Sequence, residues 1–388
     1  MILTRNQEEG LKTAIARYNN KEAYTCIAGY AGTGKSTLVQ FIISALNIPE
    51  ERVVYIAYTG KAAQVLRTKG CPNAMTAHRL LYQSFPKKDG TFTHIPIRPL
   101  YPYKIIVVDE VSMLPKHMWE LLLSHKIHVL ALGDPGQLPP VAAEPHGVLD
   151  HPHIFLDEIM RQAQESEIIR LTMDIREQKP LQLMRGNEVR IVDRDEMLND
   201  GFLAWADQIL VGKNDTRFAI NSFMREVLMN TDDPHPLVGD RIICLKNNWE
   251  CINETGDALV NGLSGTITNL TYTKDNPFME VTPIADFTPD YDNAKSFLAL
   301  EMDYKIFMEH EPTINKNNFK RIPKYYQPNQ FDYAYAITCH KSQGSEYDKV
   351  IVLEEYLKGD SKEEHARWLY TAATRAAKKL IIVRNYHK

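Results

Sequence analysis

The feature that most constrains this chain is an eight-residue segment near its N-terminus, Gly29-Tyr-Ala-Gly-Thr-Gly-Lys35-Ser36. It has the form GxxxxGKS, the pattern of a phosphate-binding P-loop. A β-prone run, 24–28, precedes it, and a run with apolar residues at helical spacing, 37–46, follows it. Unpaired N–H groups and the helix dipole favour anions at a helix N-terminus. The segment therefore predicts a nucleoside triphosphate site between a strand and a helix, and a plain Gly-rich turn is the less favoured interpretation.

The Lys and Ser that end this segment have distinct expected roles. Lys35 would reach the β- and γ-phosphates, and the hydroxyl group of Ser36 would hold Mg²⁺. The glycines allow the backbone to approach phosphate oxygens closely. ATP and Mg²⁺ are therefore the predicted cofactors. The residues that we expect to contact the nucleotide here are Gly29, Gly32, Thr33, Gly34, Lys35, Ser36 and Thr37.

Gln7 has two interpretations. Thr4 could be the N-cap of the amphipathic segment 7–18, and Gln7 lies three residues later, at the capping-box position. The Gln7 amide could instead donate to and accept from the edge of an adenine base, as a further nucleotide contact. The sequence leaves both interpretations open.

Two further strand ends carry candidate catalytic residues. The apolar run Ile105–Val108 ends at Asp109 and Glu110. Because ligands of open α/β sheets bind beyond the carboxyl ends of strands, Asp109 would bind Mg²⁺ and Glu110 would orient and deprotonate the attacking water. The run 129–132 leads into Gly-Asp-Pro-Gly-Gln137, and Gln137 could hydrogen-bond the γ-phosphate. Taken alone, that last stretch is only a turn.

Polar residues near other predicted strands are candidates for contact with a ligand. The β-branched run 53–57 predicts a buried strand, and Thr59 and Lys61 follow it at the opening of a helix. Thr59 could equally be a simple N-cap. Thr76 and His78 come next, although a lone His is more often packed or exposed than functional.

Two segments interrupt the α/β pattern. The segment 85–95 looks like a hairpin with Asp-Gly at its tip, and it carries Phe85 and Phe92. Three prolines follow it and break any regular element. The segment from about 271 to 330 is rich in Pro, Asp, Asn and aromatic residues, which predicts an insertion that is partly β and partly irregular.

Length and composition exclude several classes of protein. The 388 residues suffice for about two to three domains. The net charge of −4 means that a nucleic-acid partner would have to be held by a local groove. No apolar run approaches a membrane span, and the N-terminus is too polar for a secretory signal. The five scattered cysteines predict reduced thiols in a cytosolic protein.

Taken together, these stretches resemble the motifs of superfamily 1 helicases, in the RecD-like branch that includes the phage Dda helicases. The resemblance runs from Leu3 to Val383, in the order of the family. The chain departs from the family at Tyr30 and Tyr58, where Pro is frequent, outside the chemical core. The matching residues and stretches are Gln7, 29–36, 58–63, 76–78, 109–110, 133–140, 161–162, 338–346 and 370–375.

The resemblance implies an α/β fold with two RecA-like P-loop NTPase domains, which contain parallel sheets and bind ATP between them. Residues 1–160 would form the first domain, with a small wedge hairpin at about 82–103. Residues 161–270 and 331–388 would form the second, and residues 271–330 an SH3-like β insertion on it.

The resemblance also implies roles for individual residues. Arg161 and Arg375 would be arginine fingers on the γ-phosphate, and Gln343 and Gly344 would lie at the nucleotide. Without the motif set, a surface ion pair would be the simpler interpretation of each arginine. Phe92 would separate strands at the wedge, with the other hairpin Phe as the alternative. The residues expected to contact DNA are Thr59, Lys61, Thr76, His78, Phe92, Thr338 and His340.

The leading interpretation is an ATP-driven helicase that translocates 5′→3′ on single-stranded DNA and unwinds duplex; the direction comes from the resemblance alone. Single-stranded DNA and single-strand/duplex junctions are the expected partners, with replication, recombination or repair proteins as candidates. We expect a monomer that contacts no membrane and lies in the cytoplasm of a bacterial or phage-infected cell, or in association with the nucleoid. Two alternatives are an ATPase that acts on RNA or remodels protein–DNA complexes without processive unwinding, and a nucleotide-dependent switch. The intact set of catalytic residues argues against an inactive ATPase.

Overall fold

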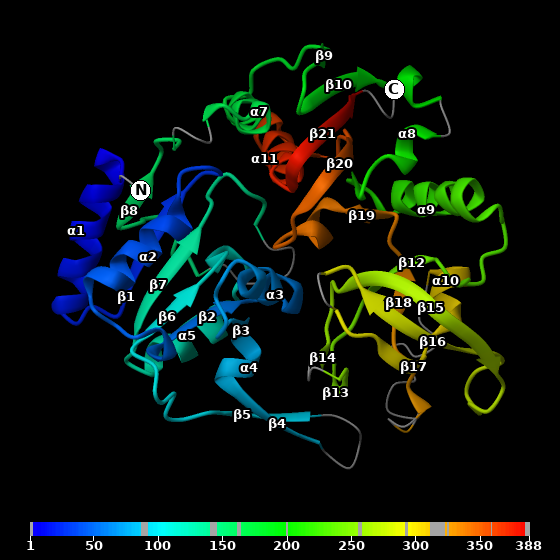
Figure 1. The fold of residues 1–388 in the computed structure, drawn as a ribbon, viewed down its shortest axis with the longest axis horizontal. Helices are drawn as coiled ribbons and strands as arrows, with labels where there is room; N and C mark the ends of the chain where they lie inside the picture. The colour runs from blue at the N-terminus through cyan, green and yellow to red at the C-terminus, as the bar shows by residue number, and fades with distance from the viewer. Residues whose placement is uncertain are drawn as a thin grey trace. The chain divides into compact units, whose positions relative to one another are not determined.

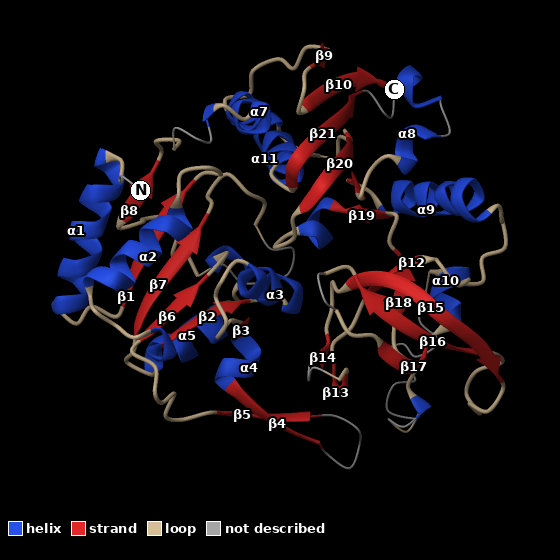
Figure 2. Cartoon of the chain, in the orientation of Figure 1, coloured by secondary structure: helices blue, strands red, loops and turns tan. Residues whose placement is uncertain are grey.

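The structure is a computed structural model of the 388-residue chain, and its elements are shown in Figures 1 and 2. Its chain forms two compact units. The first comprises Met1–Gln83, Ile95–Glu196 and Ser342–Lys388, and the second comprises Ser84–His94 and Met197–Lys341. The structure describes residues 3–86, 92–139, 146–160, 164–198, 201–254, 258–291, 294–310, 323, 326–357 and 359–384.

A six-stranded parallel sheet is the centre of the first unit. Its strands are β1 Tyr24–Gly29, β2 Val53–Ala57, β3 Met75–Thr76, β6 Ile105–Val108, β7 His128–Gly133 and β8 Ile154–Leu156. They lie in the order β3-β2-β6-β7-β1-β8, and every neighbouring pair is parallel. The carboxyl ends of β1, β6 and β7 therefore meet at one edge, which gathers the P-loop, Asp109 and Asp134 there.

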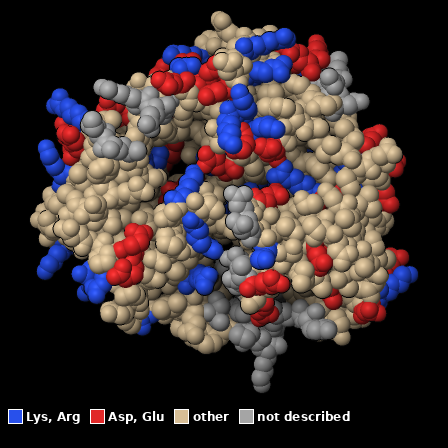
Figure 3. Space-filling view, viewed as in Figure 1, with Lys and Arg blue, Asp and Glu red and all other residues tan. Residues whose placement is uncertain are grey.

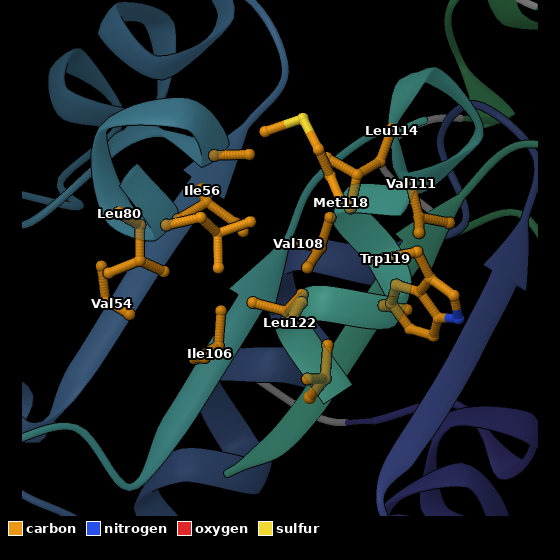
Figure 4. Close-up of a cluster of buried hydrophobic side chains, with 14 of the residues drawn as sticks. Val54, Ile56, Leu80, Ile106, Val108, Val111, Leu114, Met118, Trp119 and Leu122 are labelled. Atoms are coloured by element: carbon orange, nitrogen blue, oxygen red, sulfur yellow. The ribbon is translucent and has the colours of Figure 1, made fainter. Parts of the chain in front are cut away.

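Helices cover both faces of this sheet, because successive strand residues point to opposite sides. The helices are α1 Arg5–Asn19, α2 Lys35–Ala45, α3 Gly60–Thr68, α4 Ala77–Leu81 and α5 Lys116–Ser124. Val54 and Ile56 of β2 belong to the core beneath α4 and α5, which includes Trp119 and is drawn in Figure 4. The intervening Val53 and Tyr55 belong to the opposite core, beneath α1 and α2.

The first unit contains a further group of strands. They are β9 Met184–Arg185, β10 Val189–Asp193, β20 Tyr347–Leu353 and β21 Ala376–Arg384. The central strand β21 pairs in parallel with β20 and β10, and β9 pairs antiparallel with β10. Helices α7 Glu167–Arg176 and α11 Lys362–Ala373 pack on one another and on β21. A capping box between Ser361 and Glu364 fixes the start of α11.

The second unit combines a short α/β part with an antiparallel sheet. The α/β part comprises α8 Gly201–Ala204, β11 Gln208–Val211, α9 Asn214–Met229 and β19 Ala336–Thr338. The antiparallel sheet has the order β17-β16-β15-β12-β18. Its strands are β12 Arg241–Cys244, β15 Ser264–Thr273, β16 Thr282–Pro289, β17 Phe297–Glu301 and β18 Phe331–Tyr333.

Smaller elements complete the chain. The ribbons are β4 Tyr82–Pro86 with β5 Phe92–Pro96, and β13 Asn248–Ile252 with β14 Ala258–Leu259. In the described part of the chain, a further helix is α10 Tyr304–Glu309. Single 3₁₀ turns are η1 Glu50–Arg52, η2 Val111–Met113, η3 Arg194–Leu198 and η6 Cys339–Ser342.

The α/β class and the parallel sheet are confirmed. The β4–β5 ribbon coincides with the expected hairpin, whose tip at 87–91 lies outside the described residues. The antiparallel sheet extends beyond the expected insertion, because β12 and β18 lie outside 271–330 and β15 begins at Ser264. The SH3-like character of that insertion is not confirmed, and the expected domain boundaries stay a prediction.

One face of α9 carries polar side chains at helical spacing that turn inward. Arg217 donates to Asp332 at 2.6 Å, and Arg225 donates to Asp240 at 2.9 Å. Asn221 donates to the carbonyl oxygens of two residues of the neighbouring segment. All three α9 side chains are buried, so they stabilise the second unit rather than forming a solvent-exposed face.

Among the described residues, none of the helices combines the length and the apolar character that crossing a bilayer requires.

Candidate nucleotide-binding and active site

The P-loop connects β1 to α2 and leaves the N-terminus of α2 open. Gly32 and Gly34 both have φ of 77°, a left-handed conformation that glycine adopts without strain. A Cβ atom at Gly29 would lie 2.7 Å from the carbonyl oxygen of Leu156. In the described part of the chain, no side chain caps α2. An uncapped helix N-terminus behind a Gly-rich loop fits a phosphate group.

The ammonium group of Lys35 lies against the P-loop backbone. Its Nζ donates to the carbonyl oxygens of Gly29, at 2.8 Å, and of Tyr30, at 3.0 Å. The hydroxyl group of Thr33 donates to the same Tyr30 oxygen. Lys35 therefore lies where it can exchange carbonyl oxygens for phosphate oxygens.

Tyr30, one of the two departures from the family pattern, has aromatic and cationic neighbours. The Arg176 guanidinium lies 3.6 Å from the centre of the Tyr30 ring, and Phe155 meets that ring edge to face. A pocket of about 190 Å³ adjoins Tyr30, Arg176 and Tyr370. The Tyr30 side chain, which is larger than the Pro frequent in the family, is thus held by contacts with Arg176 and Phe155.

Gln7 forms the capping box that was one of its two interpretations. Its Oε1 accepts from the Thr4 N–H, and the Thr4 hydroxyl accepts from the Gln7 N–H. Its Nε2 also donates to the carbonyl oxygen of Thr33 in the P-loop, at 3.1 Å. Gln7 therefore ties α1 to the P-loop, and contact with adenine stays a prediction.

Asp109 and Glu110 follow β6 directly, and Glu110 has an unusual backbone. Its φ of 47° and ψ of 54° are left-handed, which costs a non-glycine residue on the order of 1–3 kcal/mol. Its N–H donates to Asp109 Oδ1 at 3.1 Å. Such strain persists where the surrounding structure over-determines the backbone, and it is found most often at functional sites.

Arg375, just after α11, lies next to Glu110. Its Nη1 is 3.6 Å from Glu110 Oε1, a length typical of an ion pair rather than of a tight hydrogen bond. The other guanidinium contacts go to the carbonyl oxygens of Thr371 and Ser345 and to the Thr374 hydroxyl. The structure thus brings together the arginine and the carboxylate that the sequence placed 265 residues apart (375 − 110).

Burial raises the pKa of both carboxyl groups above their ordinary values. The pKa of Asp109 is raised chiefly by desolvation, and the nearby charge of Lys35 opposes the shift. The pKa of Glu110 is also raised by desolvation, and the positive charge of Arg375 opposes this shift. The Glu110 side chain is 24% exposed. A carboxylate with a raised pKa is a better proton acceptor near neutral pH.

The raised pKa of Glu110 predicts an acid limb in the pH profile of ATP hydrolysis. A base acts when deprotonated, so kcat/KM falls as pH decreases through the raised pKa of Glu110, above the ordinary Glu range. The residual hydrolysis of Glu110→Gln lacks this limb. ATP binding by Glu110→Gln over the same pH range controls for titration of ATP itself. An identical limb in both proteins contradicts the assignment.

The loop after β7 carries Gln137, and hydrogen bonds from distant segments of the chain hold its backbone. Leu138 N–H donates to the Thr371 hydroxyl at 2.8 Å, and Gln343 Nε2 donates to the Leu138 carbonyl oxygen at 2.8 Å. Asp134 Oδ1 accepts from the Gly136 N–H. Gln343, expected at the nucleotide, thus contacts the loop that carries Gln137, and its own contact with ATP stays a prediction.

Gly344 lies close to Ala62, Thr59 and Glu110. A Cβ atom there would be 2.8 Å from the Ala62 Cβ, 3.5 Å from the Thr59 hydroxyl and 3.7 Å from Glu110 Oε2. Its φ of 73° is left-handed. This position therefore requires a residue without a side chain, and it places the backbone of Gly344 beside the proposed base.

The DNA candidates of the first unit have identifiable partners. The Thr59 and Thr76 hydroxyl groups accept from backbone N–H groups as N-caps, the simpler of the two interpretations given for Thr59. Lys61 Nζ donates to the Tyr347 hydroxyl at 3.0 Å and lies over its ring. The His78 ring packs beside Tyr82, 5.0 Å between centres. Their contact with DNA stays a prediction.

The other candidates lie in the second unit or outside the described residues. Thr338 ends β19, His340 belongs to η6, and both are half-buried. Phe92 belongs to β5, but its side chain lies outside the described part, as does all of Arg161. Phe85 of β4 is 42% exposed.

Three residues of the site were missed because no local pattern identifies them. Tyr347 contacts Lys61, Thr371 contacts Leu138, and Tyr370 contacts the P-loop. Tyr370 and Thr371 belong to the stretch that resembles the family, but within a helix a buried Tyr predicts packing as readily as a hydrogen bond.

The family models match both ends of the chain. Residues 3–196, half of the 388, match the model of a family described as an AAA domain. Residues 333–383 match the model of a UvrD-like helicase C-terminal domain.

The curated relatives cover this chain unevenly. The ATP-dependent RecD2 DNA helicase of Deinococcus radiodurans is 37% identical over 37% of this chain and 20% of that protein. The ATP-dependent DNA helicase dda of Enterobacteria phage T4 is 24% identical over 62% of this chain and 60% of the relative. An uncharacterised protein of Methanocaldococcus jannaschii is 23% identical over 92% of this chain and 36% of its own length. The chain thus spans less than two thirds of each of these relatives.

A solved structure resembles the whole chain. The crystal structure of Pif1 helicase from Bacteroides in complex with ADP-AlF3 and ssDNA has a TM-score of 0.55 and 16% identity. The likeness covers 100% of this chain and 94% of that one. The two chains therefore share a fold.

Proposed function

We propose that this chain uses ATP hydrolysis to move along single-stranded DNA and to unwind duplex DNA. The chain belongs to the AAA domain family and is a superfamily 1 helicase of the RecD, Dda and Pif1 type. The observation that carries the proposal is the pairing of Arg375 with Glu110 beside the P-loop. A cation at the proposed base supplies the charge that phosphoryl transfer requires.

The chemistry we propose is attack of water on the γ-phosphorus, which breaks its bond to the leaving ADP oxygen. Glu110 orients the water and accepts its proton, and Lys35 and Arg375 meet the negative charge on the transferred group. Gln137 hydrogen-bonds the γ-phosphate. Ser36 and Asp109 would hold Mg²⁺, which neutralises phosphate charge when bound. We place ATP between two RecA-like domains, with Arg161 as a second arginine finger.

The DNA contacts we propose are few and mostly uncharged. The net charge is −4, and on the face shown in Figure 3 Lys and Arg side chains are interspersed with Asp and Glu. DNA would therefore be held by hydrogen bonds from hydroxyl and imidazole groups and by a small number of cations. The relatives named as DNA helicases and the Pif1 structure with ssDNA support DNA as the substrate, and the RecD-like pattern supports the 5′→3′ direction.

Strand displacement on duplexes with a 5′ or a 3′ single-stranded tail tests this proposal. We expect ATP-dependent separation of the 5′-tailed duplex only, and ATPase activity that ssDNA stimulates. Separation of the 3′-tailed duplex alone would overturn the direction. Stimulation by RNA without strand separation would favour the RNA-directed alternative, and ATPase activity that neither nucleic acid stimulates would favour the nucleotide switch.

The ribbon β4–β5 leads to a prediction that separates unwinding from hydrolysis. An aromatic side chain can stack on the last base pair at a junction, worth about 1–3 kcal/mol per base. We expect Phe92→Ala to lower strand separation severalfold while ssDNA-stimulated ATPase stays near that of the wild type. Phe85→Ala is the matched variant on the partner strand. Unchanged unwinding by Phe92→Ala removes this residue as the wedge, and a lower Tm with lost ATPase indicates a packing role.

A further inference from the structure

The hydroxyl group of Tyr370 connects two loops of the first unit that the proposed chemistry uses. It accepts from the N–H of Ala31 in the P-loop at 3.0 Å and donates to Asp134 Oδ2 at 2.7 Å. Tyr370 is 1% exposed and Asp134 is 8% exposed, so water does not readily replace either contact. One phenolic oxygen thus joins the P-loop to the loop after β7.

Asp134 also fixes the backbone of the turn that carries Gln137. Its other oxygen, Oδ1, accepts from the Gly136 N–H at 2.8 Å, and its carbonyl oxygen accepts from the Gln137 N–H at 3.2 Å. The Tyr370 ring packs on the same turn, because a Cβ atom at Gly136 would lie 3.1 Å from it. The backbone that carries Gln137 is therefore fixed by side-chain and backbone contacts of Asp134.

The following residue is held by the same helix. Leu138 N–H donates to the hydroxyl of Thr371, which adjoins Tyr370 in α11, and Gln343 donates to the Leu138 carbonyl oxygen. Gln137 thus lies between two anchored residues, Asp134 and Leu138. Among the side chains that hold these two residues, Tyr370 also contacts the P-loop through its hydroxyl group.

We propose that Tyr370 is a positioning residue for ATP hydrolysis, whose hydroxyl group sets the distance between the P-loop and the loop that presents Gln137 to the γ-phosphate. The inference rests on the role proposed above for Gln137. A group that contacts the phosphate in the transition state must be placed within a fraction of an ångström, and a displacement of 1 Å can lower the rate by about 100-fold. In this proposal Tyr370 acts through its contacts with Ala31 and Asp134.

Tyr370→Phe removes the hydroxyl and keeps the ring. We expect kcat to fall by about 10- to 100-fold while KM for ATP and the affinity for a fluorescent ADP analogue change by less than about threefold. A purely structural role would lower Tm without this separation between kcat and KM.

Tyr335 provides a matched control within the second unit. Its hydroxyl group also joins a backbone N–H, that of Arg241, at 3.3 Å, to a buried carboxylate, Asp240 Oδ1, at 2.9 Å. Tyr335→Phe therefore removes a hydroxyl group from the same kind of groups, while Asp240 Oδ1 keeps its ion pair with Arg225, and it should also lower Tm. We expect it to leave kcat near that of the wild type.

A double-mutant cycle with Gln137→Ala decides whether Tyr370 acts through Gln137. We expect the two losses in kcat to be far from additive, because a residue that acts through Gln137 has little left to affect once Gln137→Ala has removed that contribution. If Gln137→Ala lowers kcat but Tyr370→Phe behaves like Tyr335→Phe, or if the two losses add, the inference is overturned and the proposed function stands. If Gln137→Ala leaves kcat unchanged, the proposed role of Gln137 fails, and the inference fails with it.

Discussion

We expect the replacement of Arg375 by Ala to lower kcat for ATP hydrolysis by about 10³- to 10⁵-fold, while the affinity for ATP changes much less. Negative charge on the transferred group is met best in the transition state, so the loss falls on kcat. The guanidinium is already aligned by Thr371, Thr374 and Ser345. Steady-state kinetics together with equilibrium binding of a fluorescent ATP analogue measure the two effects separately.

Two further variants make this result specific. Arg375→Lys keeps the charge but loses the planar fork, so we expect it to restore only a small part of the rate. Arg384→Ala also removes the partner of a buried carboxylate, since Arg384 Nε lies 3.3 Å from Glu354 Oε2. It should lower Tm and spare kcat. A normal kcat with weaker ATP binding for Arg375→Ala would reassign this arginine to a ground-state contact.

We expect Glu110→Gln to leave ATP binding intact and to lower hydrolysis by about 10²- to 10⁴-fold. The amide has nearly the same shape as the carboxyl group but cannot accept the proton from the attacking water. Binding does not suffer in the same way, because the substitution removes a negative charge from the neighbourhood of the phosphates. Single-turnover hydrolysis and nucleotide binding, measured on one preparation, give the rate and the affinity.

The matched control is Glu354→Gln. Glu354 is buried and, like Glu110, contacts an arginine, Arg384, and it also contacts His365 in the same unit. Its substitution should cost stability without changing the rate of hydrolysis. Hydrolysis by Glu110→Gln at the wild-type rate would show that another group is the base, and Asp109 would then be the neighbouring carboxylate to examine.

The sequence by itself determined the elements whose signal is local. GxxxxGKS between a β-prone run and a helical run placed β1, the P-loop and α2 correctly, since glycine conformation and apolar spacing act over a few residues. The apolar run before Asp109 and Glu110 became β6 for the same reason. Parallel strands carry their loops to one edge, so the nearness of these motifs followed from the α/β pattern.

Tertiary structure decided how the side chains of distant segments meet. Tyr370 lies 339 residues from Ala31, and Gln343 lies 205 residues from Leu138, yet each pair is joined by a hydrogen bond. Whether a polar side chain caps its own helix or anchors another loop depends on what folding brings beside it, as Gln7 shows by doing both. The antiparallel sheet likewise includes β12 and β18, which lie before and after the expected insertion in the sequence. Strand pairing depends on long-range register and not on local composition.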